Sequence, residues 1–203
     1  MSDPVEEAAG SALAGGLIVF PTDTVYGLAT RPDEPSATAR LFQAKGRSRE
    51  LELPILVASV EAAREVAAFD ERSAALAGRF WPGPLTLVLA RSEASHGWEL
   101  GGDGSTVGVR MPHHPLALAV LARTGPLAVT SANRSGEPTP ATCEELVRVF
   151  GDAVEVYVCQ EEPLAGSAST VLDLAGPHAR ILRAGVLAVG DIAEVLGPVA
   201  GPV

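Results

Sequence analysis

The sequence predicts an α/β fold in which helices cover the faces of one twisted central sheet. Short apolar runs of strand length alternate with segments of helical spacing throughout the 203 residues, and this alternation is typical of a layered α/β domain. No internal repeat or low-complexity linker interrupts it, and a chain of this length can bury a full hydrophobic core. We therefore expect one domain over residues 1–203, with its core at 10–190 and a short Gly/Pro-rich tail at 197–203.

The first half of the chain alternates helix and strand signals. Asp3 followed by Pro4 is an N-cap before a first-turn proline, and Ser59 and Asp70 are N-caps of two later helices. The expected helices cover residues 3–14, 35–44, 59–68 and 70–81. The expected strands cover residues 17–20, 55–58 and 85–90. The first strand is a continuous apolar run, which indicates that both its faces are covered, and it ends in the polar turn Thr22–Thr24.

The second half continues the pattern up to the Gly/Pro-rich end. A polar, glycine-rich loop is expected at 92–103. The expected strands cover 105–110, 127–130, 154–158, 169–174 and 179–183, and the expected helices cover 115–123, 142–150 and 191–196. Ligands of such folds bind outside the strand ends, so the candidate site loops are Thr22–Thr24, Ser131–Gly136 and the region around Arg110. Trp81, in a rigid Trp-Pro-Gly-Pro turn, is expected in the core.

Composition limits the function and the location. The formal net charge of −10 argues against a stand-alone nucleic-acid binder, since such a protein needs a broad basic face, and any anion site must be local. The N-terminus is acidic, and no apolar stretch approaches the roughly 20 residues that span a bilayer, so we expect a cytoplasmic protein without a membrane segment. Cys143 and Cys159 fit no CxxC or metal spacing and are too few for a disulfide framework, so we expect reduced thiols.

Lys45 is the one lysine in a chain with fourteen arginines. It follows the helix expected at 35–44 and lies beside Arg47 and Arg49. A compact ammonium, kept in a chain that otherwise uses guanidinium groups, indicates a place where a point charge matters. A lysine that survives by chance on a solvated loop is an equally good interpretation of the composition.

Familiar catalytic and nucleotide-binding motifs do not occur in the sequence. It has no GxxxxGK[ST] phosphate-binding loop and no GxSxG serine-hydrolase elbow. The glycine run at 101–104 precedes a strand, whereas a dinucleotide fingerprint follows one. His113 and His114 are adjacent and cannot share a helical face at ligand spacing, so no metal site is expected. What remains are hydroxyl and guanidinium groups on loops.

These loop residues suit anion binding, although each also has an ordinary interpretation. Ser131–Gly136 places two hydroxyls, an amide and a guanidinium after a buried strand, as in a phosphate cradle or in a turn that satisfies its own backbone. Arg110 ends a strand, where it can clamp a carboxylate or extend to water. Arg183 and Ser169 lie at two further strand ends and carry no stronger signal individually.

Taken together, six segments resemble the YrdC-like threonylcarbamoyl-AMP synthase family, also named TsaC. They occur in family order between residues 17 and 185, and they are Phe20–Leu28, Ala44–Arg47, Phe80–Leu87, Val107–Pro112, Ser131–Gly136 and Ser169–Val171. The resemblance implies the YrdC-like fold with a concave basic cavity. It also implies an enzyme that condenses L-threonine, bicarbonate or CO2 and ATP into threonylcarbamoyl-AMP and pyrophosphate, for N6-threonylcarbamoyladenosine formation in tRNA.

The same resemblance implies roles for individual residues. Lys45 and Arg47 would be catalytic by stabilising phosphate charge, with no covalent nucleophile. The implied ATP-binding set is Lys45, Arg47, Thr106, Ser131, Asn133, Thr139 and Arg183. The implied threonine-binding set is Thr24, Arg110, which would hold the carboxylate, and Ser169. ATP is then a substrate and should bring Mg²⁺, without a dedicated metal site in the protein. The resemblance also implies tRNA and a downstream threonylcarbamoyl-transferase complex as further partners.

The sequence departs from the family pattern at several positions, among them Thr130, Ala168 and Ala184, and two other functions stay open. Leu53 and Ala58 stand where many relatives have asparagine and histidine. Longer relatives carry a second C-terminal domain, which we expect this chain to lack. One alternative is a non-catalytic RNA-binding module, which the net charge opposes. The other is a carbamoyl-transfer domain of hydrogenase maturation, which would be fused to zinc-finger and acylphosphatase modules.

Overall fold

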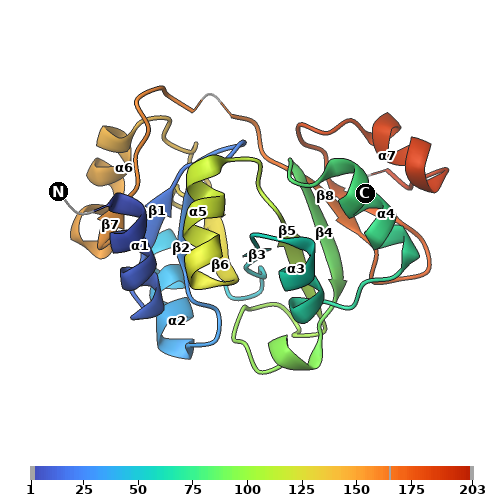
Figure 1. Cartoon of the computed structure of the whole chain (residues 1–203), viewed down its shortest axis with the longest axis horizontal. Coiled ribbons are helices and arrows are strands. Elements are labelled where there is room, and N and C mark those ends of the chain that lie inside the picture. Colours follow the sequence, from blue (N-terminus) through green and yellow to red (C-terminus); the bar gives the residue numbers. More distant parts are fainter. Residues whose placement is uncertain (1–2, 165, 202–203) are drawn as a thin grey trace.

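The chain forms a mixed nine-stranded sheet with helices on both faces, as seen in a computed structural model that describes residues 3–164 and 166–201 (Figure 1). The strands are β1 (Ile18–Phe20), β2 (Gly27–Thr30), β3 (Ile55–Leu56), β4 (Leu85–Ala90), β5 (Thr106–Arg110), β6 (Leu127–Ser131), β7 (Val156–Tyr157), β8 (Thr170–Asp173) and β9 (Arg180–Arg183). The helices are α1 (Pro4–Leu13), α2 (Pro35–Lys45), α3 (Val60–Val66), α4 (Glu71–Phe80), α5 (Pro115–Thr124), α6 (Cys143–Phe150) and α7 (Val189–Leu196). The strand order is β7-β1-β2-β6-β3-β5-β4-β8-β9. The predicted α/β fold is confirmed.

Capping side chains begin the helices where the sequence predicts. Asp3 and Ser59 each accept a hydrogen bond from a backbone N–H in the first turn of α1 and α3. Asp70 forms a reciprocal capping box with Ser73 at the start of α4. These contacts satisfy N–H groups that have no partner inside the helix. At the other end of α2, Gly46 adopts a left-handed φ of 62°, which glycine tolerates without a steric cost.

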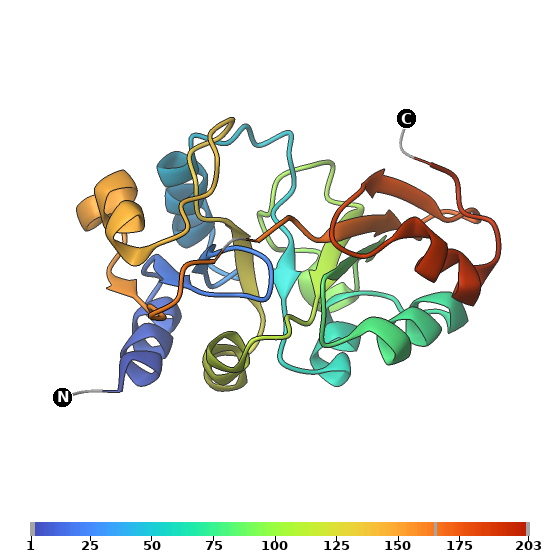
Figure 2. The same ribbon diagram turned by 90° about the horizontal axis from the view of Figure 1, so that it is seen from above.

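Helices cover both faces of the sheet, and two hydrophobic core clusters pack against it. Figure 2 shows α1, α3, α4 and α5 on one face and α2 and α6 on the other. Ile18 and Phe20 of β1 pack into the core cluster that includes residues of α1 and α5, whereas Leu17 and Val19, which point to the opposite face of this strand, pack into the larger cluster. All four side chains are at most 1% exposed. The prediction that this strand is covered on both faces is therefore confirmed, and its alternating side chains explain how.

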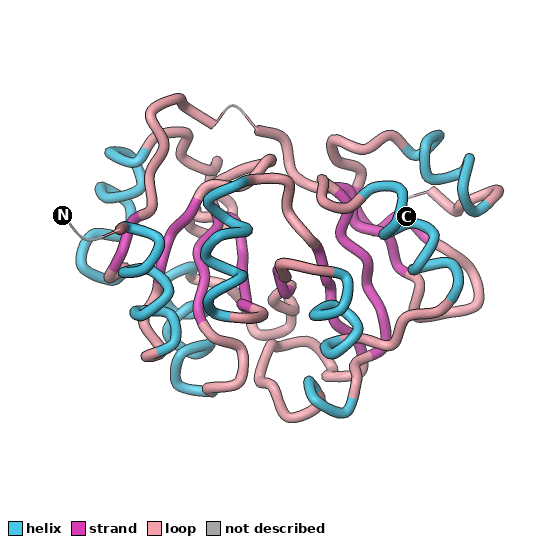
Figure 3. The backbone as a smooth tube through the Cα atoms, viewed as in Figure 1, coloured by secondary structure: helices cyan, strands magenta, loops and turns pink. Residues whose placement is uncertain are grey.

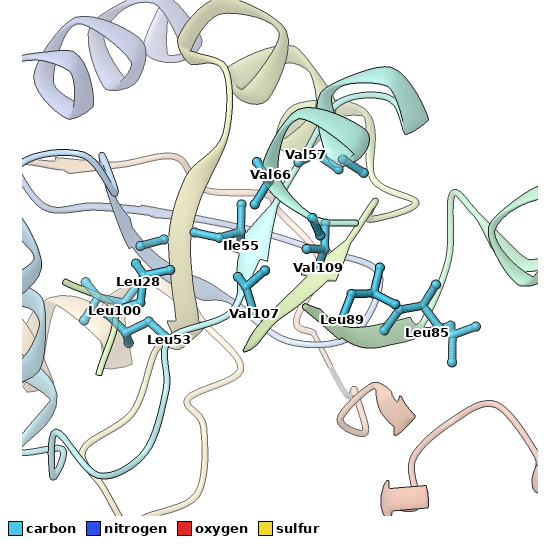
Figure 4. Close-up of a cluster of buried hydrophobic side chains, with 14 of the residues drawn as sticks. Leu28, Leu53, Ile55, Val57, Val66, Leu85, Leu89, Leu100, Val107 and Val109 are labelled. Atoms are coloured by element: carbon cyan, nitrogen blue, oxygen red, sulfur yellow. The ribbon is translucent and has the colours of Figure 1, made fainter. Parts of the chain in front are cut away.

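The larger core cluster spans the middle of the sheet. Figure 4 shows side chains from β3, β4 and β5 meeting in it, among them Ile55, Leu89 and Val109. Trp81 joins this cluster, as predicted, and its indole N–H donates to the carbonyl of Leu85 at 2.7 Å. This core fixes the ends of β4 and β5, from which the candidate site residues extend.

Strand β2 is the one strand of the described chain that the sequence analysis missed. It pairs antiparallel with β1, with Phe20 opposite Gly27, so Thr22–Thr24 is part of a hairpin turn. A Cβ atom on Gly27 would lie 2.7 Å from the side chain of Val129 on the neighbouring strand β6, so only glycine fits at this position. The short apolar run of β2 is hidden in the sequence because it follows the turn without a polar boundary.

The C-terminal part of the chain crosses the molecule and returns to the sheet edge. Figure 3 shows residues 158–164 and 166–169, between β7 and β8, along the top of the view. Beyond α7, Ala200 forms a parallel bridge with Arg180 of β9. The predicted tail 197–203 is thus tied to the sheet over its described part, and residues 202–203 lie outside the described residues. None of the helices in the described ranges has the length and apolar character needed to cross a bilayer.

The two cysteines form a disulfide, so the prediction of reduced thiols is wrong. Cys143 is the first residue of α6, and Cys159 follows the end of β7. Their Cα atoms are 5.8 Å apart, which is within the range that a disulfide requires. The pairing depends on the chain returning from α6 to β7, and a spacing of 16 residues does not reveal that return.

Reduction of this disulfide should lower the free energy of unfolding by about 3 kcal/mol, because the cross-link restricts a loop of roughly 15 residues in the unfolded chain. Urea unfolding with and without a thiol reductant measures the difference. The Cys143→Ser/Cys159→Ser variant is the control and should not respond to the reductant. Alkylation of both thiols in the unreduced parent would contradict the pairing.

Candidate active site

Four basic side chains from distant parts of the chain interact electrostatically. Lys45 ends α2, Arg47 follows it, Arg110 ends β5 and Arg183 ends β9. Burial lowers the pKa of Lys45 to about 8, and repulsion from Arg47 adds to this shift. Burial also lowers the pKa of Arg47 and of Arg110, and in both cases repulsion from Arg183 contributes. These interactions link Lys45 to Arg47, and they link both Arg47 and Arg110 to Arg183.

Lys45 is buried, so the interpretation of a chance lysine on a solvated loop is wrong. It is the last residue of α2, and only 3% of it is exposed. Its Nζ donates to the carbonyl of Ser131 at 2.6 Å, to Oγ of Ser131 at 3.0 Å and to Oδ1 of Asn133 at 2.7 Å. An ammonium has three N–H donors, and these contacts use all of them. Lys45 therefore ties the end of α2 to the loop that follows β6.

Asn133 organises that loop from within. Its Nδ2 donates to two carbonyls of the same loop, at 2.8 and 2.7 Å. Its Oδ1, which accepts from Lys45, also accepts from Oγ1 of Thr139 at 3.2 Å. The structure thus brings together Lys45, Ser131, Asn133 and Thr139, four residues of the predicted ATP-binding set, in one hydrogen-bond network.

The Arg110 guanidinium is buried and held by three acceptors. Its Nε donates to the carbonyl of Gly83 at 2.9 Å, its Nη1 to Oγ1 of Thr24 at 2.9 Å and its Nη2 to Oδ1 of Asp23 at 2.5 Å. The Asp23 carboxylate counteracts the effect of burial on the pKa of Arg110. Each terminal nitrogen keeps a second N–H, and two such groups can bind a ligand carboxylate in parallel. Arg110 and Thr24, both predicted to bind threonine, therefore lie side by side at the hairpin turn.

Ser169 and Arg183 form the third part of the site. Arg183 donates through Nε and Nη2 to the carbonyl of Ser169, at 3.1 and 2.9 Å, and through Nη2 to its Oγ at 3.0 Å. The Ser169 hydroxyl also lies 2.9 Å from Oγ1 of Thr86. A register shift between β8 and β9 pairs Val171 with Arg183, whereas the next pair is Leu172 with Ile181. Because paired residues share a face, this bulge turns Arg183 away from the buried face of Ile181.

Arg47 and Arg183 keep donors for an anion, whereas Lys45 does not. Arg47 donates through Nε to the carbonyl of Leu51 at 3.1 Å and through Nη2 to the carbonyl of Glu52 at 2.9 Å. Among the contacts of the described residues, Nη1 of Arg47 and Nη1 of Arg183 make no hydrogen bond. A guanidinium has five N–H donors, so both arginines can bind phosphate oxygens without breaking the contacts that hold them.

Thr106 lies apart from the Lys45 network. It begins β5, at the opposite end of the strand from Arg110. Its hydroxyl is 3.5 Å from the carboxylate of Glu52, whose carbonyl accepts from Arg47. Thr106 is thus linked to the site through the loop that follows α2.

Asp23 and Gly83 are the contributors that the sequence analysis did not assign. Both lie inside the family segments, and both hold Arg110. Asp23 also accepts from the backbone N–H of His113 at 2.9 Å. The sequence did contain a signal for the pair of Asp23 and Arg110: a carboxylate between two threonines in a turn, and an arginine predicted at a strand end.

Two departures from the family pattern, at Leu53 and Ala58, bring no polar group to the site. Leu53 is fully buried in the larger core cluster, and its backbone N–H donates to the carbonyl of Leu100. Ala58 packs against the smaller cluster.

Two cavities of about 320 and 370 Å³ lie elsewhere, beside Cys143 and beside Arg72. The concave basic cavity over the four cations therefore stays a prediction.

Comparison with known proteins matches this fold and these segments. The family model of the Sua5, YciO and YrdC proteins, described as telomere recombination, matches residues 12–185. A Mycobacterium tuberculosis protein provisionally named as a threonylcarbamoyl-AMP synthase is 40% identical over 95% of this chain and 89% of its own length. The threonylcarbamoyl-AMP synthase of Pyrococcus abyssi is 40% identical over 95% of this chain.

A solved structure of a relative gives the same architecture. P. abyssi Sua5 complexed with L-threonine superposes with a TM-score of 0.89 over 99% of this chain, at 36% identity. The match covers 60% of that Sua5 chain and 57% of the P. abyssi synthase sequence, so this chain spans less than two thirds of both. The family model covers most of the chain, and two relatives share 40% of its residues. The chain belongs to the Sua5/YciO/YrdC family.

Proposed function

We propose that this chain is an L-threonylcarbamoyladenylate synthase, a nucleotidyltransferase that condenses L-threonine, bicarbonate or CO2 and ATP. The observation that carries the proposal is that the cations differ in the donors they keep for a ligand. Arg110 presents a pair of N–H groups beside Thr24, and Arg47 and Arg183 keep free donors in the same region. One carboxylate and one polyphosphate can thus bind together in a molecule whose net charge is otherwise −10.

The threonine site consists of Arg110, Thr24 and Ser169. The two remaining N–H groups of Arg110 donate a parallel pair of hydrogen bonds to the substrate carboxylate. The hydroxyls of Thr24 and Ser169 are held by Arg110 and Arg183 respectively, so they are oriented before the substrate arrives. A site that is ordered in advance loses less entropy on binding.

The ATP site consists of Arg47, Arg183 and the loop that Lys45 holds. The threonine amine first captures CO2 as a carbamate and releases a proton; bicarbonate supplies the CO2 by loss of water. A carbamate oxygen then attacks the α-phosphorus, and the bond from this phosphorus to the bridging oxygen of the β-phosphate breaks, so that pyrophosphate leaves. The threonine carbamate, ATP and pyrophosphate are all anionic, so positioned cations and hydrogen-bond donors lower the barrier more than a covalent nucleophile would. In this proposal Arg47 contacts the phosphates, and Lys45 supports catalysis through its nearby positive charge and through the loop that it holds. Thr106, Ser131, Asn133 and Thr139 complete the nucleotide contacts.

Magnesium would enter this site with the nucleotide. Among residues 3–164 and 166–201, no group of three or more His, Cys, Asp or Glu side chains is arranged to hold a metal ion. Phosphate oxygens and water are ligands that Mg²⁺ accepts readily, so the substrate itself can supply its coordination. A cytoplasmic location, a contact with tRNA, transfer of the product to a downstream threonylcarbamoyl-transferase complex and a single-domain organisation over 1–203 remain parts of the proposal.

Purified protein that is given ATP, Mg²⁺, bicarbonate and L-threonine should release pyrophosphate, and omission of threonine should abolish the release. Threonine is required because its amine forms the attacking carbamate. Release at the same rate without threonine would overturn the proposal. A gel shift with tRNA over a salt series tests the RNA-binding alternative, which requires tight and strongly salt-dependent binding without nucleotide chemistry.

A further inference from the structure

A buried ion pair lies next to the proposed ATP site but outside the six family segments. Nη2 of Arg91 is 2.6 Å from Oε1 of Glu52, and their side chains are 1% and 19% exposed. Arg91 follows β4, and Glu52 lies in the loop between α2 and β3. Burial raises the pKa of Glu52, and the contacts with Arg91 oppose this change. A pair of charges in such a place contributes little net stability compared with well-packed apolar side chains, so its presence requires another explanation.

Glu52 is directly connected to Arg47. The carbonyl of Glu52 accepts from Nη2 of Arg47 at 2.9 Å, and the preceding carbonyl, of Leu51, accepts from its Nε at 3.1 Å. These two carbonyls determine the direction in which the free Nη1 of Arg47 points. The loop that carries them can hold that direction only if Glu52 itself is fixed.

Arg91 fixes Glu52 and the beginning of β5 at the same time. Its Nε donates to the carbonyl of Thr106 at 2.7 Å, while its Nη2 binds the Glu52 carboxylate. Its Nη1 donates to the carbonyls of Ser95 and Trp98 at 3.3 and 2.8 Å. One planar side chain thus joins the loop after α2, the segment after β4 and the first residue of β5. A methionine of similar length could fill the space but could not make these directed contacts.

We propose that Glu52 and Arg91 are positioning residues for ATP, which hold Arg47 and Thr106 in the orientation that binds the nucleotide. The proposal rests on the function proposed above. Neither residue touches the substrates, and both act through Arg47 and Thr106. Threonine binding should be nearly independent of the pair, because no contact of Glu52 or Arg91 reaches Arg110, Thr24 or Ser169 in the described chain.

The test compares Glu52→Gln, Arg91→Lys and Arg91→Met with the parent in steady-state assays and in direct binding of a fluorescent ATP analogue. Glu52→Gln and Arg91→Met should each raise the KM for ATP and the Kd of the analogue by about tenfold or more, since a misplacement of roughly 1 Å can cost on the order of a hundredfold. The KM for threonine should stay near the parent value. Arg91→Lys keeps the charge but lacks the planar guanidinium. It should therefore be as stable as the parent, and its affinity for ATP should lie between those of the parent and Arg91→Met.

Arg72→Met is the matched control. Arg72 also pairs with a carboxylate, Asp70, and donates to the carbonyls of Leu174, Gly176 and Pro177, but it lies at the far end of β8 from Ser169. Its loss should lower the melting temperature and leave the KM for ATP unchanged. Equal effects on the KM for ATP and for threonine in folded Glu52→Gln, or no effect on either, would overturn the inference. An inactive but well-folded parent would instead overturn the proposed function.

Discussion

Replacement of Lys45 by methionine should slow pyrophosphate release by roughly a hundredfold, since one lost cation or donor at such a site costs on the order of 3 kcal/mol of barrier. Methionine fills the same space but donates no hydrogen bond. The carbonyl of Ser131 and the Oδ1 of Asn133 would lose the ammonium that now joins them. The loop after β6 would then lose its attachment to α2, and the phosphates would lose a nearby positive charge. Steady-state assays at saturating ATP and threonine measure the change.

The same lysine should give the parent a characteristic pH profile. Burial, together with repulsion from Arg47, lowers the pKa of Lys45 to about 8, and the protonated ammonium is the form that holds the loop. Raising the pH through about 8 should therefore decrease kcat/KM for ATP, which reports the free enzyme. Bound phosphates favour the charged form, so the decrease in kcat should occur at a higher pH. Lys45→Met should show neither decrease.

The same titration of Lys45 should change activity and stability in opposite directions: with rising pH the activity falls, whereas the contribution of Lys45 to the free energy of unfolding rises. The unfolded chain binds the Lys45 proton with the ordinary pKa of 10.5, and the folded chain binds it less tightly. Between pH 8 and 10.5 the unfolded state therefore holds more protons at this position, and the free energy of unfolding rises with pH as far as this group is concerned. A loss of activity above pH 8 without a loss of folded protein would separate titration from unfolding.

Arg49→Met is the matched control for Lys45→Met. Arg49 belongs to the same basic segment, but it is exposed, lies over the Phe42 ring and pairs with Glu99 at 3.5 Å. Exposed pairs of this kind contribute about 0–1 kcal/mol, so turnover should be close to that of the parent. Turnover of Lys45→Met at the parent rate would contradict the role given to Lys45.

The element pattern could be read from the sequence because its signals are local. The caps at Asp3, Ser59 and Asp70 and the continuous apolar run of β1 act within one turn or one strand, and each is confirmed. Strand β2 was missed because it has no polar boundary. The disulfide was missed because it depends on how α6 and β7 come together, which no spacing encodes.

The residues of the candidate site were predictable as types but not as partners. The lone Lys45 is distinctive in composition, yet its burial and its three acceptors follow from the packing of α2 against the loop after β6. Asp23 lies in a family segment, but the sequence indicates no role for it, because its contact with Arg110 joins residues 87 positions apart. Only the structure distinguishes these two cations: all N–H groups of Lys45 are used in hydrogen bonds, whereas Arg47 keeps free N–H groups.

Arg110→Ala should raise the KM for threonine by about a hundredfold or more, because a carboxylate that loses a buried, charge-assisted donor pair loses roughly 3 kcal/mol or more of binding energy. The KM for ATP should change much less, since the Lys45 network does not include Arg110. Substrate titrations with threonine and with ATP give the two values separately. Arg123→Ala, which removes an exposed arginine of α5, is the control and should leave both values unchanged.

A folding defect must be separated from this binding defect. Removal of Arg110 leaves the Asp23 carboxylate, 14% exposed, without its charge partner, and breaking a buried pair in this way costs about 3–5 kcal/mol of stability. The Asp23→Asn/Arg110→Ala variant removes the stranded charge and should recover part of the melting temperature, but it should keep the high KM for threonine. Recovery of the parent KM in that double variant would show that Arg110 only supports the fold and that the threonine carboxylate binds elsewhere.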